Sequence, residues 1–344
     1  MTWAPLLLGD PSPSLRLLVL RELLHREEDD PEVVELRDIR EEDPLVSGLL
    51  ELQQRDGSWS STGLDASLAL SEVHSTSQAL IRLGYIGLGQ DHPAVQRGAE
   101  FLFSRQREDG AWEIPSRGGD RGETEGYSMI PLQTAIPLRA LASCGYSSDP
   151  RIEKAYEWLL AQRLEDGAWP TGISSGNYGY VAGYRRLAHS RWGCRSNTTG
   201  ALSCLALHPE HQSSPEAKRA LDLLLGRETK ERHAIGYDIA RTIGVERARG
   251  FLTYYARFDL AQVLDLCWRI GASKEDGRIA EIIEFMIKQQ GNYGLWEYTA
   301  NPQASRWITF DLLRSLSRLE ESVEWVSMEP RTPFRAYPRR RRRF

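Results

Sequence analysis

The sequence predicts an all-α protein, a closed α/α toroid of about five to six helical hairpins. A helix–turn–tryptophan repeat recurs along the chain, and helices of a second, more apolar type lie between its copies. The period-two apolar alternation that is typical of half-buried strands is almost absent. We therefore expect no substantial β-sheet.

The repeat consists of an amphipathic helical stretch, a glutamine, a glycine-containing turn and a tryptophan. Its copies cover residues 49–60, 101–115, 158–170 and, in a weaker form, 286–298. An Asp-Gly turn lets the chain reverse sharply. We expect each tryptophan to be a strut between neighbouring hairpins, and the glutamine amide to cap an exposed helix end.

The helices between these copies are apolar around most of their circumference, which is typical of helices that are buried on both sides. They cover residues 14–25, 75–87, 134–146, 199–207, 259–272 and 308–319. Prolines that suit a first helical turn mark the starts of the half-polar helices, at Pro44, Pro93, Pro150 and Pro215. This alternation predicts two concentric layers, with the apolar helices inside.

The segment Gln53-Gln54-Arg55-Asp56-Gly57-Ser58-Trp59 resembles the QW repeat of squalene and oxidosqualene cyclases and of protein prenyltransferase β subunits. The resemblance covers residues 10–320, although 196–227 lacks the tryptophan turn. It implies a toroid whose central cavity takes an isoprenoid. Residues 254–319 also resemble the C-terminal part of short single-toroid bacterial members of this superfamily, a resemblance that implies no particular activity.

The acid and zinc motifs of those families are missing. No Asp-x-Asp-Asp occurs, so the resemblance does not extend to direct triterpene cyclisation. Asp259 matches the aspartate of the prenyltransferase zinc set, but Ala261 and Ile308 stand where its cysteine and histidine belong. Because a zinc site needs at least three protein ligands, we expect no metal and no cofactor. Asp265-Leu266-Cys267 repeats the Asp-x-Cys pattern inside a helix and is interpreted as coincidence.

The first residues of the apolar helices and the loops before them are expected to line the cavity mouth. Asp259 and His74 are the candidate acid or base, with helix capping as the alternative for Asp259 and a hydrogen-bonded structural role as the alternative for His74. The candidate substrate-binding residues are Tyr127, Tyr184, Arg191, Trp192, Arg195, Tyr254, Tyr255, Phe258, Arg306 and Trp307. The loop arginines could bind an anionic head group.

Two other functions stay open. One is a non-catalytic toroid that binds a lipid or a protein partner. The other is a carbohydrate-active α/α barrel, which needs paired carboxylates, and Asp259 with Asp238 or Glu72 could supply them. Our preferred hypothesis is an isoprenoid-handling enzyme with an apolar cavity, because aromatic faces stabilise carbocations.

The composition sets the remaining expectations. The net charge of −5 argues against a nucleic-acid partner, and the N-terminal apolar run is too short for a signal peptide or a membrane span. The four cysteines lack Cys-x-x-Cys spacing and are interpreted as buried apolar residues of a cytoplasmic protein. Residues 1–320 are assigned to the toroid and 321–344 to a C-terminal extension with five consecutive arginines. That tail is interpreted as disordered, with peripheral contact to acidic lipid as the alternative.

Overall fold

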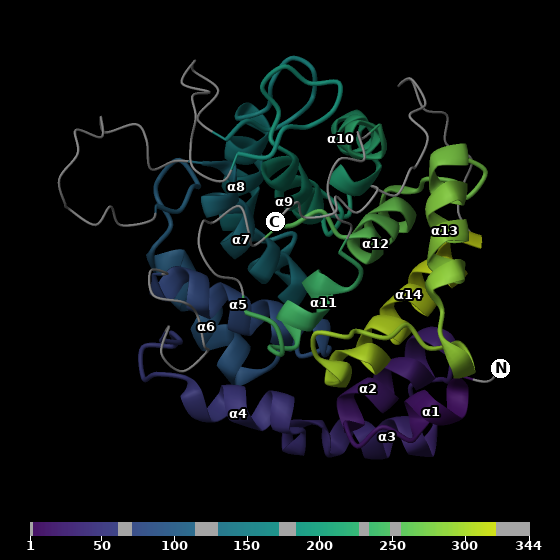
Figure 1. Cartoon of the computed structure of the whole chain (residues 1–344). Helices are drawn as coiled ribbons and strands as arrows, with labels where there is room; N and C mark the ends of the chain where they lie inside the picture. The colour runs from purple at the N-terminus through teal and green to yellow at the C-terminus, as the bar shows by residue number, and fades with distance from the viewer. Residues whose placement is uncertain are drawn as a thin grey trace, which may run out of the picture.

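The protein folds as an α/α toroid, with an inner ring of helices surrounded by outer helices (Figure 1). The computed structural model describes residues 3–60, 71–113, 130–171, 184–226, 234–247 and 256–320. Within these ranges β pairing is limited to isolated bridges, as the sequence predicts. The predicted fold class is therefore confirmed.

The inner ring is formed by helices that share one large apolar core. Its members are α2 (Pro13–Leu18) with its π-helical extension η1 (Val19–Leu23), α5 (Glu72–Tyr85), α7 (Pro131–Leu141) continued by η3 (Ala142–Tyr146), α9 (Arg195–Leu205), α12 (Leu260–Ile270) and α14 (Ser305–Glu320). Neighbouring helices pack against one another, α5 on α7, α7 on α9 and α12 on α14. The last inner helix, α14, contacts η1, so the last inner helix lies beside the first one.

The outer layer pairs each inner helix with the helix that follows it in the chain. Its members are α6 (Pro93–Ser104), α8 (Pro150–Ala161), α10 (Pro215–Leu225) and α13 (Gly277–Gln289), which pack on α5, α7, α9 and α12. The N-terminal helices α1 (Ala4–Leu8), α3 (Pro31–Asp38) and α4 (Pro44–Leu52), with the short turns η2 (Arg40–Glu42), η4 (His211–Ser213), η6 (Asn292–Gly294) and η7 (Pro302–Ala304), complete the molecule. Each of the four predicted prolines stands at a helix start, where its missing N–H costs nothing.

Four buried tryptophans join the hairpins with one recurring geometry. The indole nitrogen of Trp59, Trp112, Trp169 or Trp296 donates to the carbonyl oxygen ten residues earlier, at 2.7–2.8 Å. Its backbone N–H donates to a threonine hydroxyl in the first half of the following inner helix, which is Thr76, Thr134, Thr198 or Thr309. Because each side chain bonds to its own outer helix and each backbone N–H to the next inner helix, these residues are the expected struts.

The glutamine of the repeat is a cap in three copies. The amide nitrogens of Gln53, Gln106 and Gln290 donate to the carbonyl oxygen of the turn glycine four residues later, at 2.8–3.0 Å. Gln53 and Gln106 also bond to a carbonyl oxygen in the first turn of the following outer helix. In the third copy the equivalent position is Arg163, so the alignment of Gln162 with the other glutamines was wrong by one residue.

A short helix inside the ring was not predicted. Helix α11 (Tyr237–Thr242) contacts α5, α12 and α14, and Figure 1 places it near the centre of the toroid. It extends from the N-terminus of α12, where Asp259 accepts the Gly236 backbone N–H, to the last turn of α5, where Arg82 donates to the Thr242 carbonyl oxygen. The lumen of the ring is therefore partly filled by the chain itself.

Candidate active site

A cavity lies inside the ring, towards the C-terminal ends of the inner helices. Its volume is about 420 Å³, which is within the range of small-molecule sites. Residues from the second halves of α5, α7 and α9 line it, together with α11, α12, α14 and η1. The sequence placed the site at the opposite, N-terminal ends of the inner helices.

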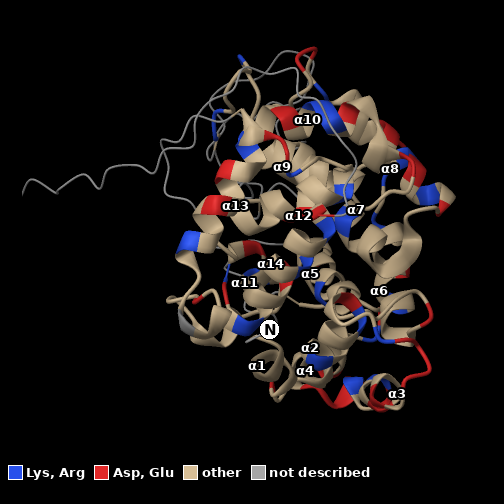
Figure 2. Cartoon of the chain, turned by 90° about the vertical axis from the view of Figure 1, so that its right-hand side faces the viewer, with Lys and Arg blue, Asp and Glu red and all other residues tan. Residues whose placement is uncertain are grey.

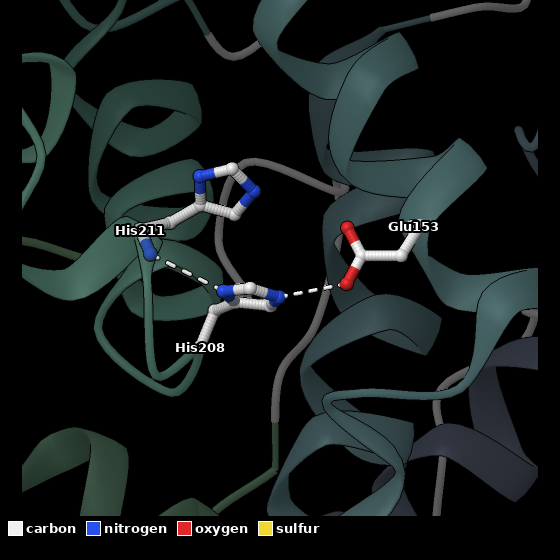
Figure 3. Close-up of side chains that lie close together, drawn as sticks. All are labelled: Glu153, His208 and His211. Carbon is white, nitrogen blue, oxygen red and sulfur yellow. Dashed lines mark hydrogen bonds and ion pairs between the residues drawn. The ribbon is translucent and has the colours of Figure 1, made fainter.

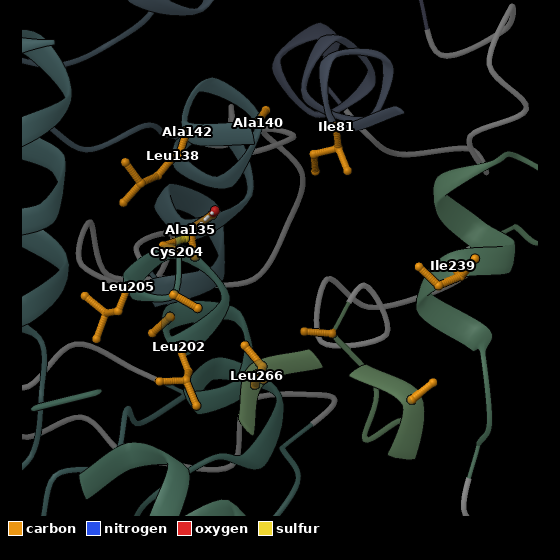
Figure 4. Packing of buried hydrophobic residues seen from close by; sticks show 14 of the residues in the cluster. Ile81, Ala135, Leu138, Ala140, Ala142, Leu202, Cys204, Leu205, Ile239 and Leu266 are labelled. Atoms are coloured by element: carbon orange, nitrogen blue, oxygen red, sulfur yellow. Dashed lines mark hydrogen bonds between the residues drawn. The ribbon is translucent and has the colours of Figure 1, made fainter. Parts of the chain in front are cut away.

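One part of the cavity wall is apolar. Ile81, Ile239 and Leu266 come from three different helices around the cavity (Figure 4), and Leu18 and Leu207 extend this surface. Trp268 supplies an aromatic ring, and its indole nitrogen donates to Asp265 at 3.1 Å. This part of the wall agrees with the expected apolar cavity.

The other part of the wall is charged, so the expectation of an apolar cavity needs correction. Asp238 of α11 receives two hydrogen bonds from Arg139 of α7, at 2.7 and 3.2 Å, and one from Arg241 at 2.9 Å. These guanidinium groups hold the pKa of Asp238 well below its usual value, although burial alone would raise it. Figure 2 shows acidic and basic positions near α7, α12 and α14 as well as on the outer helices.

A second charged group lies on α12 and α14. Asp265 accepts a hydrogen bond from Arg269 at 2.8 Å and one from Arg314 at 3.4 Å. Arg314 also donates to Asp311, three residues earlier on the same helix. Arg314 therefore links two carboxyl groups that both line the cavity.

These two carboxyl groups differ in acidity. Burial raises the pKa of Asp311 to about 7, an effect that the Arg314 charge opposes and the Asp265 charge reinforces. Arg269 and Arg314 together outweigh burial at Asp265 and lower its pKa. Near neutral pH this group on α12 and α14 thus holds one ionised carboxylate beside one carboxyl group that can still carry its proton, an arrangement typical of acid–base sites.

Asp259 lies outside the lining of this cavity. Its carboxyl group accepts the backbone N–H groups of Gly236, Asp238 and Ala261 at 2.8, 2.8 and 3.0 Å. It is 1% exposed, and burial raises its pKa to about 6 against the lowering effect of these donors. This geometry supports the capping alternative and adds a second task, which is to attach α11 to α12.

The carbohydrate alternative needs two facing carboxylates, and Asp259 with Asp238 was one candidate pair. Asp259 bonds to the backbone of Asp238, whereas the Asp238 side chain bonds to Arg139 and Arg241. Glu72, the other candidate partner, begins α5. Neither Asp259 nor Glu72 lines the described cavity.

His74 is fully buried in the first turn of α5. Its Nδ1 lies 3.1 Å from the Ser71 hydroxyl, and burial lowers its pKa to about 4. The imidazole is therefore neutral at physiological pH. Like Asp259, it does not line the cavity, and the catalytic role of both residues stays a prediction.

The predicted substrate-binding residues fall into separate groups. The Arg195 guanidinium lies 5.1 Å from the Phe258 ring centre, and Arg191 covers the half-exposed Trp192 at 5.3 Å. Tyr184 is half-buried. Tyr127, Tyr254 and Tyr255 lie outside the described residues.

Arg306 and Trp307 begin α14 but face different neighbours. Arg306 forms an ion pair with Asp10 at 2.9 Å, and the ring of the buried Trp307 lies 6.0 Å from that of Tyr85, which lines the cavity. Trp307 thus packs against Tyr85, a residue of the cavity wall.

The residues that sequence reasoning missed are the charged side chains within the inner helices. Arg139, Asp265, Asp311 and Arg314 all stand in helices that were interpreted as almost wholly apolar. A charged side chain in a buried helix needs a partner of opposite charge. This requirement could have identified these four residues from the sequence. The interpretation of Asp265 as a coincidental match overlooked it.

One histidine cluster on the outer layer has the composition of a metal site. Glu153, His208 and His211 bring their ligand atoms within 4.8 Å of one another (Figure 3). However, His208 Nδ1 accepts the backbone N–H groups of Glu210 and His211, so its proton is on Nε2, which donates to Glu153 at 2.9 Å. Metal binding through Nε2 needs a protonated Nδ1, and the two backbone donors oppose that form. The donor set does not fit a metal ion.

The fold and cavity define a toroidal protein with a central cavity, and comparison with known proteins shows what the chain is similar to. Residues 36–184 match the family model described as the squalene-hopene cyclase C-terminal domain. This chain is 29% identical over 149 residues to a squalene–hopene cyclase of Zymomonas mobilis, covering 43% of this chain and 21% of that enzyme. It is 27% identical over 116 residues to a lanosterol synthase of Candida albicans, covering 33% of this chain and 15% of that enzyme. The QW-type repeats of this chain are therefore similar in sequence to those of squalene–hopene and lanosterol cyclases.

The matched stretch spans about a fifth of the length of the squalene–hopene cyclase. Among solved structures, the type II terpene cyclase MstE from Scytonema resembles this chain with a TM-score of 0.33 and 15% identity, covering 79% of this chain and 94% of that one. No helix in the described part of the chain is long and apolar enough to cross a membrane.

Proposed function

We propose that this protein is a terpenoid cyclase-like enzyme that takes an isoprenoid molecule into the central cavity, with Asp311 as its general acid. The observation that carries the proposal is the Asp311 carboxyl group, which lines the cavity and has a pKa raised to about 7 by burial. General acids work best when their pKa lies near the working pH. The repeats that match the squalene–hopene cyclase model support the substrate class.

The neighbours of Asp311 give the proton transfer its direction. Asp311 gives its proton to a substrate atom, and the carboxylate that remains is stabilised by the Arg314 guanidinium already bonded to it. Asp265 stays ionised throughout because Arg269 and Arg314 hold its pKa low. Its negative charge can stabilise a cationic intermediate in the cavity. A second proton from solvent or product returns Asp311 to its starting form.

The proposed acid belongs to α14, whereas the sequence suggested Asp259 before α12 and His74 in α5. Asp311 and Arg314 are one helical turn apart on α14, so they share a helix face. A pKa near 7 suits protonation of an oxygen better than protonation of an isolated alkene, which needs a much stronger acid. The missing Asp-x-Asp-Asp motif agrees with a reaction of this kind.

The test replaces Asp311 by asparagine, which keeps the shape and removes the proton. Wild-type protein is incubated with a series of prenyl alcohols and their epoxides, and the products are identified by mass spectrometry. The Asn variant should lose at least a hundredfold in turnover, within the range attributed to one general acid. In the wild type, turnover should fall as the pH rises through about 7, where Asp311 loses its proton.

Asp222→Asn is the matched control. Asp222 is equally buried and forms an ion pair with Arg278 at 2.8 Å, but it does not line the cavity. This variant should lose stability and keep turnover at temperatures where it is folded. Full turnover in Asp311→Asn, or no conversion of any isoprenoid by the wild type, would contradict the proposal.

A non-catalytic toroid is the second candidate. Asp238, Asp265 and Asp311 of the cavity wall each form an ion pair with at least one arginine. Such pairing is typical of a structural network and favours this candidate. A lipid that copurifies with the wild type and is retained unchanged by Asp311→Asn would support it. A cytoplasmic location and contact of the arginine-rich residues 339–343 with acidic lipid stay predictions, since these residues lie outside the described ranges.

A further inference from the structure

Three uncharged polar side chains that line the cavity each have an atom with no hydrogen-bond partner among the residues that the structure describes. The atoms are the Tyr85 hydroxyl oxygen on α5, the Thr242 hydroxyl oxygen on α11 and the side-chain oxygen of Gln262 on α12. All three atoms are buried. Buried polar atoms in native proteins are nearly always paired, and a molecule bound in the cavity could pair with these three.

The hydrogen-bonding character of two of these groups is fixed by their surroundings. Gln262 donates from its amide nitrogen to the Ser203 hydroxyl at 3.2 Å, so its oxygen faces the cavity as an acceptor. Burial and the Asp311 charge raise the pKa of Tyr85 well above its ordinary value, so its phenol keeps its proton and can donate. The Thr242 hydroxyl can donate or accept.

The three groups share the cavity with apolar side chains and do not form a wholly polar pocket. Leu18, Ile81, Leu207 and Leu266 line the same cavity. A ligand that satisfies both surfaces has a hydrocarbon body and several hydroxyl groups. A pure hydrocarbon would cover the three polar atoms without pairing them, and such unpaired atoms weaken binding.

We infer that the cavity takes a terpenoid that carries at least two hydroxyl groups, and that Tyr85, Thr242 and Gln262 select it over the corresponding hydrocarbon. One ligand hydroxyl accepts from Tyr85 and donates to Gln262, and another pairs with Thr242. This inference rests on the proposed function for the hydrocarbon part of the ligand. It adds the polar groups and the residues that recognise them.

The test measures binding of three C20 probes to the full chain by tryptophan fluorescence. The probes are a diterpene hydrocarbon, the corresponding mono-alcohol and the corresponding diol. Affinity should rise by about three- to tenfold with each hydroxyl group, as expected for one net hydrogen bond. Tyr85→Phe and Thr242→Val should each weaken diol binding by about the same factor and leave hydrocarbon binding unchanged.

Ser315→Ala is the matched control, because the Ser315 hydroxyl is also buried and unpaired among the described residues but does not line the cavity. It should change no affinity. Equal binding of hydrocarbon and diol, equal weakening of both by Tyr85→Phe and Thr242→Val, or binding of none of the probes would overturn the inference.

Asp311→Asn separates this inference from the proposed function. If the ligand class is right and the catalytic role is wrong, the diol binds selectively to the wild type and is never converted. If the catalytic role is right and the ligand class is wrong, the hydrocarbon and the diol bind equally and conversion is lost in Asp311→Asn.

Discussion

Replacing Asp259 by alanine should destabilise the protein by far more than the loss of an ordinary helix cap. Three backbone N–H groups, those of Gly236, Asp238 and Ala261, donate to this carboxyl group, and two of them belong to the start of α11. An ordinary cap is worth about 1 kcal/mol, and each buried donor left unpaired costs about 1–3 kcal/mol. Because the three losses share one side chain and do not add fully, we expect about 3–5 kcal/mol for Asp259→Ala.

Asparagine is an informative replacement for Asp259, because it keeps one side-chain oxygen and replaces the other by an NH₂ group. Its single side-chain oxygen can take the place of Oδ1, which accepts from Gly236 and Ala261. Its NH₂ group then faces the Asp238 N–H, so two donors oppose each other. We therefore expect Asp259→Asn to cost about 1–3 kcal/mol, whereas a simple capping role predicts almost no effect.

The measurement is urea unfolding of both variants, with Ser214→Ala as the control. Ser214 caps α10 through one hydrogen bond, from Ala217 N–H at 3.1 Å, and its loss should cost about 1 kcal/mol. If Asp259→Ala costs no more than Ser214→Ala, the attachment of α11 by Asp259 is refuted. Loss of ligand binding by Asp259→Asn with an unchanged free energy of unfolding would instead favour the catalytic prediction.

The pH dependence gives an independent check on the same residue. The pKa of Asp259 rises from 3.8 to about 6 on folding, mainly because of burial. A raised folded-state pKa stabilises the protein below the unfolded pKa, and this contribution is lost as pH rises through the folded one. The stability of the wild type relative to Asp259→Asn should therefore decline between about pH 4 and pH 6 and stay constant above that window.

Two further predictions concern the repeat and the metal. Trp112→Phe should lower the free energy of unfolding by about 2–4 kcal/mol, because it removes a buried hydrogen bond to Leu102 at 2.8 Å and leaves a void. In the control Trp192→Phe, at a side chain 42% exposed, the change should stay within about 0.5 kcal/mol. Equal losses of stability in the two variants would contradict the strut role. Elemental analysis should find no stoichiometric zinc, and one zinc per chain that is lost in His208→Gln or in Asp259→Asn would overturn this prediction.

The fold could be predicted from the sequence because the contacts that define each hairpin are made between residues of the same repeat. Each buried tryptophan donates to a carbonyl oxygen ten residues earlier, so the two bonded residues are close in the chain and the same spacing recurs in the sequence. Helix α11 could not be predicted in the same way. It has six residues, and its position depends on Asp259 and Arg82, which lie 17 or more positions away along the chain.

The cavity was less predictable because it does not lie at the starts of the inner helices. Asp259 and His74 stand at helix starts and were selected for that reason, yet the cavity lies near the other ends of the inner helices. Arg314 lowers the pKa of both Asp311 and Asp265. Burial outweighs this effect at Asp311 and raises its pKa, whereas Arg269 and Arg314 together outweigh burial at Asp265 and lower its pKa. Such shifts depend on distances across α12 and α14, and a sequence pattern holds no information on these.

The position of α11 connects these observations. A helix inside the lumen brings Asp238 to Arg139 of α7 and Arg241 to the Gln78 amide of α5, so part of the polarity of the cavity comes from the helix that fills the ring. The same helix supplies Thr242, and its C-terminal carbonyl oxygen is bonded to Arg82 at 2.9 Å. Loosening α11 by Asp259→Ala should therefore weaken diol binding through Thr242 as well as stability. The polar part of the cavity wall therefore depends on the attachment of α11, whereas the apolar part is formed mainly by the inner helices.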